Sequence, residues 1–218
     1  MVANIARSCK IKKVRDWKEI AIMVSYLDVT NYFIIRAHED GLASTMTNMK
    51  AQKLLYYSQS LHLALFSKPL VDEQIQAWRL GPVCPPAYRE YCKFEAEQLP
   101  FPERDILGQI PKDVVDLLEK VWQHCGERDA FDLSRETHQE LPWIKARNGL
   151  PPDARSTEPL LASDMEELGL QKLDEIETAS PIYKQAVSIL LEDAFSANTI
   201  KSEVKQGGVR DWLNSLLV

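Results

Sequence analysis

His138 is the side chain whose type and neighbours best suit acid–base chemistry. Glu136 and Glu140 flank it in the sequence, and an imidazole beside a carboxylate can act as a general base near neutral pH. The same histidine can instead hydrogen-bond locally and pack near Trp143. We favour this second, structural interpretation, because no other catalytic pattern accompanies the histidine.

The chain has no nucleotide-binding or hydrolase motif. It lacks the glycine loops G-x-x-x-x-G-K-[ST] and G-x-G-x-x-G, the H-E-x-x-H pattern and the G-x-S-x-G elbow. Only eight glycines are present, and none are grouped as a phosphate cradle. We therefore predict no cofactor and no catalytic residue.

The cysteines are too sparse for a disulfide framework. None of them pair as C-x-x-C, which favours a reducing, cytoplasmic location. A zinc site would need His62, His124 or His138 to converge on them, and no ligand pair shows the usual close spacing. We therefore predict no metal. The four cysteines are Cys9, Cys84, Cys92 and Cys125.

Charge is distributed unevenly along the 218 residues, whose net charge is −6. Residues 1–94 carry 13 Lys and Arg against 8 Asp and Glu, whereas residues 95–180 carry 9 against 20. The acidic middle does not suit a nucleic-acid partner, and the basic N-terminal part keeps a DNA-binding role open. No stretch approaches the roughly 20 apolar residues that span a bilayer, so we expect no membrane partner.

Trp78 stands just before a turn signal, Gly81-Pro82. A tryptophan at such a place is either a hot spot for a protein partner or an anchor that holds a loop on the core. Neighbouring basic residues would form a cationic patch around it if they share its surface, and a solvated face is the alternative. These residues are Lys50, Lys53 and Arg79.

The elements that must position these residues are mostly helical. Apolar and small residues recur at three- and four-residue spacing over 49–66, and Thr47 or Asn48 can cap that helix. We expect it to be central and buried on much of its circumference. Alternation over 75–79 predicts a short strand. Further helices are predicted at 28–39 with Asp28 as N-cap, 87–94, from Pro111, 132–139 capped by Asp132 or Ser134, 142–146, 163–168, 172–176, 181–197 and 209–217.

The pattern as a whole predicts a mainly α fold with a minor short β element. We expect one compact helical domain at 23–178, preceded by a basic N-terminal extension at 1–22 and followed by a C-terminal helical extension at 179–218. Residues 149–159 are polar and proline-rich, which indicates an exposed loop. Met1 and Met23 both remain candidates for the native start.

Several motifs in order resemble the Panacea (SocA-like) family of antitoxins and phage-associated proteins. The similarity spans about residues 28–170, and Ala51, Leu80 and Cys84 depart from the family pattern in ways that suggest packing variation. The matching segments are NMKAQKLLYY at 48–57, HLALF at 62–66, KPL at 68–70, AWRLGPV at 77–83, YREY at 88–91, LS at 133–134, THQE at 137–140 and PW at 142–143.

The resemblance implies an antitoxin that is not an enzyme. It would neutralise a cognate protein toxin by direct binding, and whether it also presents that toxin to a protease stays open. The partner-binding candidates are Lys50, Lys53, Tyr56, Tyr57, Trp78, Arg79 and His138. The motif residues expected to hold the core are Asn48, Gln52, Leu54, Leu55, Gly81, Pro82, Val83, Tyr88, Thr137, Pro142 and Trp143.

Two other functions stay open at this point. The first is an enzyme that reverses a toxin's product or modification, using His138 with Glu136 or Glu140. The second is a DNA-binding autoregulator that uses the basic residues 1–22. The sequence identifies neither the toxin nor the oligomeric state, so a homo-oligomer is also open.

Overall fold

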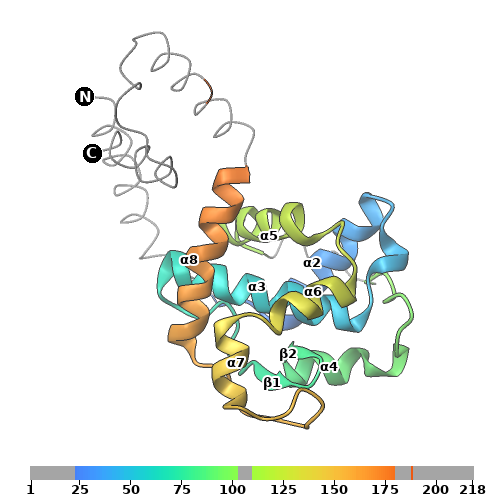
Figure 1. Ribbon diagram of the computed structural model, residues 1–218. Coiled ribbons are helices and arrows are strands. Elements are labelled where there is room, and N and C mark those ends of the chain that lie inside the picture. The colour runs from blue at the N-terminus through green and yellow to red at the C-terminus, as the bar shows by residue number, and fades with distance from the viewer. Residues whose placement is uncertain (1–22, 103–109, 180–187, 189–218) are drawn as a thin grey trace, which may run out of the picture. The chain divides into compact units, whose positions relative to one another are not determined.

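The computed structural model describes residues 23–102, 110–179 and 188 (Figure 1). Residues 23–102 and 110–179 form seven α-helices and one two-stranded antiparallel sheet, which confirms the mainly α fold. The helices are α2 (Tyr26–Glu39), α3 (Asn48–Phe66), α4 (Pro85–Tyr91), α5 (Lys112–Cys125), α6 (Ala130–Thr137), α7 (Leu141–Arg147) and α8 (Ala162–Ala179); the 3-10 turns are Ala43–Thr45 and Cys92–Phe94, and the strands are β1 (Gln76–Trp78) and β2 (Gly81–Val83).

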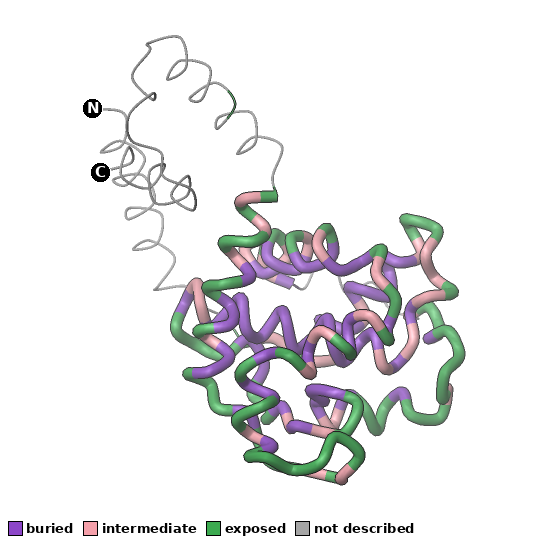
Figure 2. The backbone as a smooth tube through the Cα atoms, in the orientation of Figure 1, coloured by how far each residue is buried: buried purple, intermediate pink, exposed green. Residues whose placement is uncertain are grey.

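Helix α3 is the centre of the compact unit Ala21–Leu173. It contacts α2, α4, α5, α6 and β2, and Figure 2 shows it buried along most of its length. Leu54, Leu55 and Leu61 are almost completely buried, as are many of the polar residues between them. The expectation of a central helix is therefore confirmed.

Local signals set the ends of α3. The Thr47 hydroxyl accepts a hydrogen bond from the Lys50 amide at 3.4 Å, which confirms Thr47 as the N-cap. At the other end Ser67 adopts a left-handed conformation with φ 52°, and Pro69 follows.

The predicted caps of two other helices are wrong. Ser25 caps α2 through its hydroxyl, so Asp28 lies in the first turn instead. Asp129 caps α6, because its carboxylate accepts from the amides of Phe131 and Asp132 at 2.8 Å. Each helix therefore begins earlier than its apolar pattern indicated.

The two strands form a hairpin whose turn residues are Arg79 and Leu80. The Gly81-Pro82 pair was predicted as the turn and lies instead in β2, where Pro82 pairs with Ala77. Glycine at 81 permits the backbone φ of 100°, which other residues rarely adopt. The loop before α8 extends the sheet, because the amide of Ala77 donates to Glu158 O at 2.8 Å.

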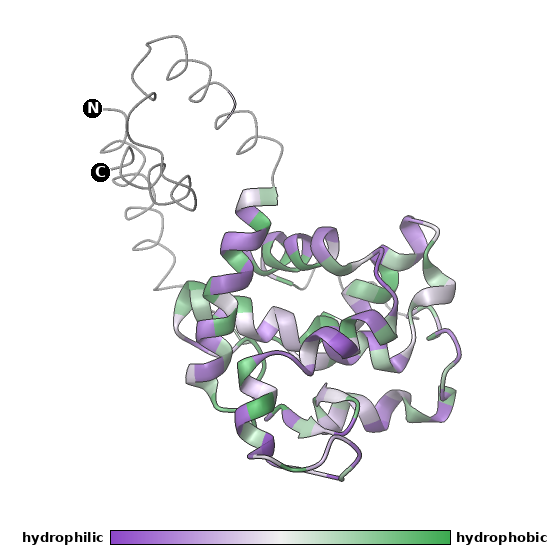
Figure 3. Cartoon of the chain, viewed as in Figure 1, coloured by the Kyte–Doolittle hydropathy of each residue, from purple (hydrophilic) through white to green (hydrophobic). Residues whose placement is uncertain are grey.

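Helix α8 is continuous where two short helices, 163–168 and 172–176, were predicted. Gly169 lies between those two segments and packs against the Ser60 carbonyl of α3, where a Cβ atom would clash. The glycine thus allows α8 to approach α3 closely. Hydrophilic residues dominate α8 in Figure 3.

Several sequence predictions concern residues outside the described part of the chain. They are the basic lead at 1–22, the helices at 181–197 and 209–217, and almost all of the C-terminal extension. The domain boundaries at 22/23 and 178/179 remain predictions.

Candidate functional site: a hairpin surface above a buried polar cluster

Four of the predicted partner-binding residues lie inside the protein. Lys50, Lys53, Tyr56 and Tyr57 are at most 2% exposed. They cannot touch a protein partner in this structure, which corrects the expectation of a cationic surface patch formed with Arg79. Burial of two lysines on one helix is unusual, and it requires that each amine finds partners inside.

Lys50 joins α3 to the loop that precedes α6. Its Nζ donates to Gly126 O at 2.6 Å and to Thr45 Oγ1 at 2.9 Å, and it lies 5.6 Å from the centre of the Trp122 ring. Burial lowers the pKa of its amine. Lys50 therefore has a structural role.

Lys53 joins α3 to the hairpin. Its Nζ donates to Pro82 O at 3.2 Å. Gly81 lies directly against it: a Cβ atom at this glycine would stand 2.7 Å from the Lys53 Nζ and 2.5 Å from the Thr137 hydroxyl. Burial lowers the pKa of the Lys53 amine to about 7, and the charge of Glu140 opposes this shift.

Glu140 is the buried acid that faces α3. Its Oε1 accepts a hydrogen bond from the Tyr57 hydroxyl at 3.0 Å and lies 3.6 Å from the Lys172 Nζ. Burial raises the pKa of its carboxyl group, and Lys172 and the Tyr57 hydrogen bond oppose the rise. Glu140 is therefore held between a tyrosine of α3 and a lysine of α8.

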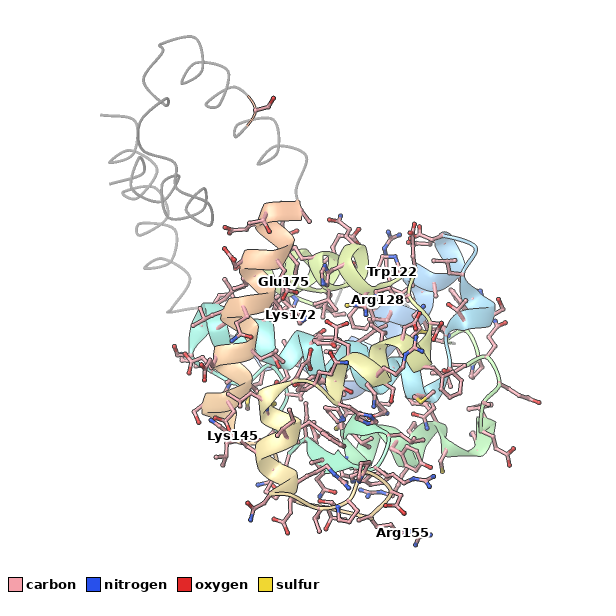
Figure 4. The ribbon with its side chains drawn as sticks, in the orientation of Figure 1. Trp122, Arg128, Lys145, Arg155, Lys172 and Glu175 are labelled. Carbon is pink, nitrogen blue, oxygen red and sulfur yellow. The ribbon has the colours of Figure 1, made fainter. Side chains whose placement is uncertain are left out.

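Glu136 is the acid that shares Lys172 with Glu140. One of its oxygens pairs with Lys172 and the other with Arg128; Figure 4 labels both cations. Burial acts to raise the pKa of Glu136, and the hydrogen bonds from Lys172 and Arg128 outweigh it, so the pKa is lowered.

We call Lys53, Tyr56, Tyr57, His138 and Glu140 the buried polar cluster; His138 is half-buried and the other four are buried. Among the described residues, the Tyr56 hydroxyl, His138 Nε2 and Glu140 Oε2 have no hydrogen-bond partner of normal geometry. The cluster combines an amine, a carboxyl group and an imidazole with perturbed pKa values, which is the composition of many active sites. Lys53, Tyr56 and Glu140 are nevertheless at most 7% exposed, so a substrate does not reach them in this structure.

His138 packs on Trp143, as the structural interpretation predicted. Its ring stacks on Trp143 with the ring centres 4.3 Å apart, and it hydrogen-bonds the backbone of Arg79. Burial and the nearby charge of Lys53 lower its pKa. The guanidinium of Arg147 lies 4.7 Å from the centre of the Trp143 ring. The three side chains thus stack beside the hairpin.

The exposed side of the hairpin carries the other predicted contacts. Arg79 is exposed at the turn, and the half-buried Trp78 meets the Tyr88 ring at a centre-to-centre distance of 4.9 Å. Leu80 is 49% exposed and Phe131 of α6 is 70% exposed. Neither Leu80 nor Phe131 was selected from the sequence. Phe131 could have been found, because it lies outside the buried face of α6, which is formed by Ala130, Leu133, Ser134 and Thr137. We call Trp78, Arg79, Leu80, Tyr88 and Phe131 the hairpin surface.

Most of the family motif forms the scaffold beneath this surface. Gln52 donates to the Asn48 side chain at 2.9 Å and accepts from the Cys84 amide at 2.9 Å, and Asn48 donates to Tyr88 O at 3.2 Å. Leu54, Leu55, Gly81, Pro82, Val83, Thr137, Pro142 and Trp143 are buried, whereas the Tyr88 side chain is 37% exposed.

The described residues hold no group of three or more His, Cys, Asp or Glu side chains that could bind a metal ion. Cys84, Cys92 and Cys125 are free thiols. None of the helices in the described part of the chain is long and apolar enough to cross a membrane.

The comparisons with known proteins agree on one family. Residues 52–144 match the family model described as antitoxin SocA-like, Panacea domain. The chain is also 28% identical over 115 residues to Antitoxin SocA of Caulobacter vibrioides (strain NA1000 / CB15N). That match covers 48% of this chain and 61% of the relative's length. No solved structure matches. Residues 52–144, from α3 to α7, are therefore similar to the Panacea domain of SocA-like antitoxins.

Proposed function

We propose that this chain is an antitoxin that neutralises a cognate protein toxin by binding to it directly in the cytoplasm. The observation that carries the proposal is the SocA-like Panacea domain at residues 52–144, together with the antitoxin named among its relatives. The hairpin within that segment exposes tryptophan, arginine and tyrosine, which are the residue types that dominate binding energy at protein interfaces.

Binding fits the interior of this domain better than catalysis does. Lys53 and Glu140 have the perturbed pKa values of catalytic groups, yet both are buried and hold the hairpin and α8 in place. A group that bridges secondary-structure elements inside a core contributes to folding without touching a substrate. The exposed residues around the hairpin are free to meet a macromolecule.

Co-expression tests the proposal. The gene that lies next to this one is expressed alone and then together with this chain, and growth is measured. We expect the neighbour to arrest growth, this chain to restore it, and a complex of the two proteins to co-purify. Growth arrest that this chain does not relieve would overturn the proposal. Measuring the toxin's half-life with and without the chain shows whether a protease also takes part.

An enzyme acting on the toxin's product or modification is the second candidate. It is favoured by the unpartnered His138 Nε2, which lies near the amine of Lys53. Under this alternative, a folded His138→Ala variant loses protection while it still binds the toxin. Under direct neutralisation, the same variant keeps protection wherever it keeps binding.

A further inference from the structure

The hairpin surface is continuous across three elements. The Ser134 hydroxyl of α6 donates to Leu80 O at 2.9 Å, which fixes α6 beside the turn. Phe131 precedes Ser134 by three residues on the same helix, so it lies on the same side as this contact. Trp78 and Tyr88 carry the surface from the hairpin to α4. The hairpin thus contacts both α6 and α4, and each of these three elements carries an exposed apolar or aromatic side chain.

Hydrogen bonds to its backbone carbonyls tie this surface to the interior. Lys53 binds Pro82 O, and the Trp143 indole donates to Trp78 O at 2.9 Å. His138 binds the backbone of Arg79, and the Asn48 amide donates to Tyr88 O. A surface that is ordered before binding loses less conformational entropy on association. The interior thus prepares the hairpin for a partner.

The arginine on this surface lacks a partner of opposite charge. Arg79 forms no ion pair with any described residue, whereas Arg36, Arg128 and Lys145 each pair with a carboxylate. The chain as a whole has a net charge of −6. An exposed, unpaired arginine beside apolar side chains favours a partner that offers it a carboxylate.

We propose that the hairpin surface is the toxin-binding site, and that the toxin presents an apolar pocket edged by carboxylates. Leu80 and Phe131 enter the pocket, Trp78 and Tyr88 contact its edge, and Arg79 pairs with a carboxylate there. This assignment rests on the proposed antitoxin function and adds the site and the chemistry of the partner.

Two double variants of matched composition test the apolar centre. Leu80→Ser with Phe131→Ser removes one leucine and one phenylalanine from the hairpin surface. Phe101→Ser with Leu170→Ser removes the same two residue types elsewhere, since Phe101 packs on His38 and Leu170 lies on α8. Phe101 and Leu170 are 55% and 56% exposed, and Leu80 and Phe131 are 49% and 70% exposed. Neither double variant therefore removes a buried side chain from the core. Affinity for the purified toxin is measured by titration calorimetry, and circular dichroism verifies the fold.

A second matched pair tests the charges. Arg79→Glu reverses one arginine of the hairpin surface, whereas Arg155→Glu reverses an exposed arginine of the loop before α8, labelled in Figure 4. Association rates are measured at low and high salt. We expect Arg79→Glu to slow association about tenfold or more at low salt, and Arg155→Glu to change it less than about twofold.

For the apolar variants, we expect the hairpin double variant to weaken affinity more than about 100-fold, and the control less than about threefold. Equal losses for the two double variants, or no loss for either, would overturn the site assignment while wild-type binding still supports the antitoxin function. Absence of wild-type binding and of growth rescue would instead reject the antitoxin function itself. A slower association for Arg155→Glu than for Arg79→Glu would overturn the proposed charge complementarity.

Discussion

The amine of Lys53 in α3 donates a hydrogen bond to the carbonyl of Pro82 in β2 at 3.2 Å. This bond ties the buried central helix to the hairpin that carries Trp78, Arg79 and Leu80. Because the amine is completely buried, its protonation carries a large desolvation cost. The stability of the hairpin is therefore linked to the charge on a single lysine.

Stability should rise with pH above about 7 because of Lys53. The pKa of this amine falls from 10.5 to about 7 on folding. Between these values the unfolded chain binds the proton and the folded chain does not, so raising the pH favours the folded state. The free energy of unfolding should increase by up to about 1.4 kcal/mol per pH unit in this window. Urea denaturation at pH 7.0, 7.5, 8.0 and 8.5 measures it.

Lys53→Met serves as the control, since it fills similar volume without a titrating group. The unfolding free energy of the wild type minus that of this variant should increase as the pH rises from 7.0 to 8.5, because only the wild type contains the titrating amine. The pKa of His138 is lowered from 6.5, so its effect lies below this window. A difference that stays constant over the window would show that Lys53 does not titrate there.

Gly81→Ala should destabilise the protein more than a substitution at another positive-φ glycine. The added methyl group would meet the Thr137 hydroxyl at 2.5 Å and the Lys53 amine at 2.7 Å, in a backbone with φ 100°. We expect a loss of about 2–4 kcal/mol from the clash and the backbone strain together. Thermal and urea denaturation measure the loss.

Gly149→Ala is the matched comparison for that loss. Gly149 has φ 79° and nothing within 4 Å of its Cβ position, so only backbone strain of about 1 kcal/mol is expected. Similar losses at positions 81 and 149 would mean that the contacts of Gly81 with Lys53 and Thr137 are not tight.

Glu140→Gln should be much milder than Glu140→Ala. The glutamine oxygen can still accept the hydrogen bond from Tyr57, and Lys172 keeps its ion pair with Glu136. Alanine leaves the buried Tyr57 hydroxyl without its acceptor. We expect losses in unfolding free energy of about 1 kcal/mol for glutamine and about 3 kcal/mol for alanine. Urea denaturation at pH 7 compares them, and the account would fail if glutamine cost as much as alanine.

Local signals explain which parts of the fold were predictable. The long apolar pattern and the Thr47 cap act within one segment, so α3 was predicted almost to its ends. The continuity of α8 depends on contact between Gly169 and Ser60 of α3, which no local pattern reveals. The turn was predicted at Gly81-Pro82 because glycine and proline are common in turns. In the structure Gly81 lies in β2, and its lack of a side chain lets the strand pack against Lys53.

The candidate site was less predictable, because its chemistry depends on distant backbone groups. Lys50 and Lys53 looked like surface cations, and their interior acceptors are carbonyls of Gly126 and Pro82. Trp78 and Arg79 were chosen by residue type and do lie on the exposed hairpin. The packing of His138 on Trp143 was predictable because the two residues are close in the sequence.

The stoichiometry of neutralisation tests the central claim most directly. A fixed amount of purified toxin is titrated with this chain, and the remaining toxin activity is measured at each ratio. Direct neutralisation predicts a linear fall in activity that ends at a fixed molar ratio, together with a complex of the same composition by light scattering. Complete protection at a small fraction of the toxin's concentration, with no complex, would contradict binding and show that the chain acts as a catalyst.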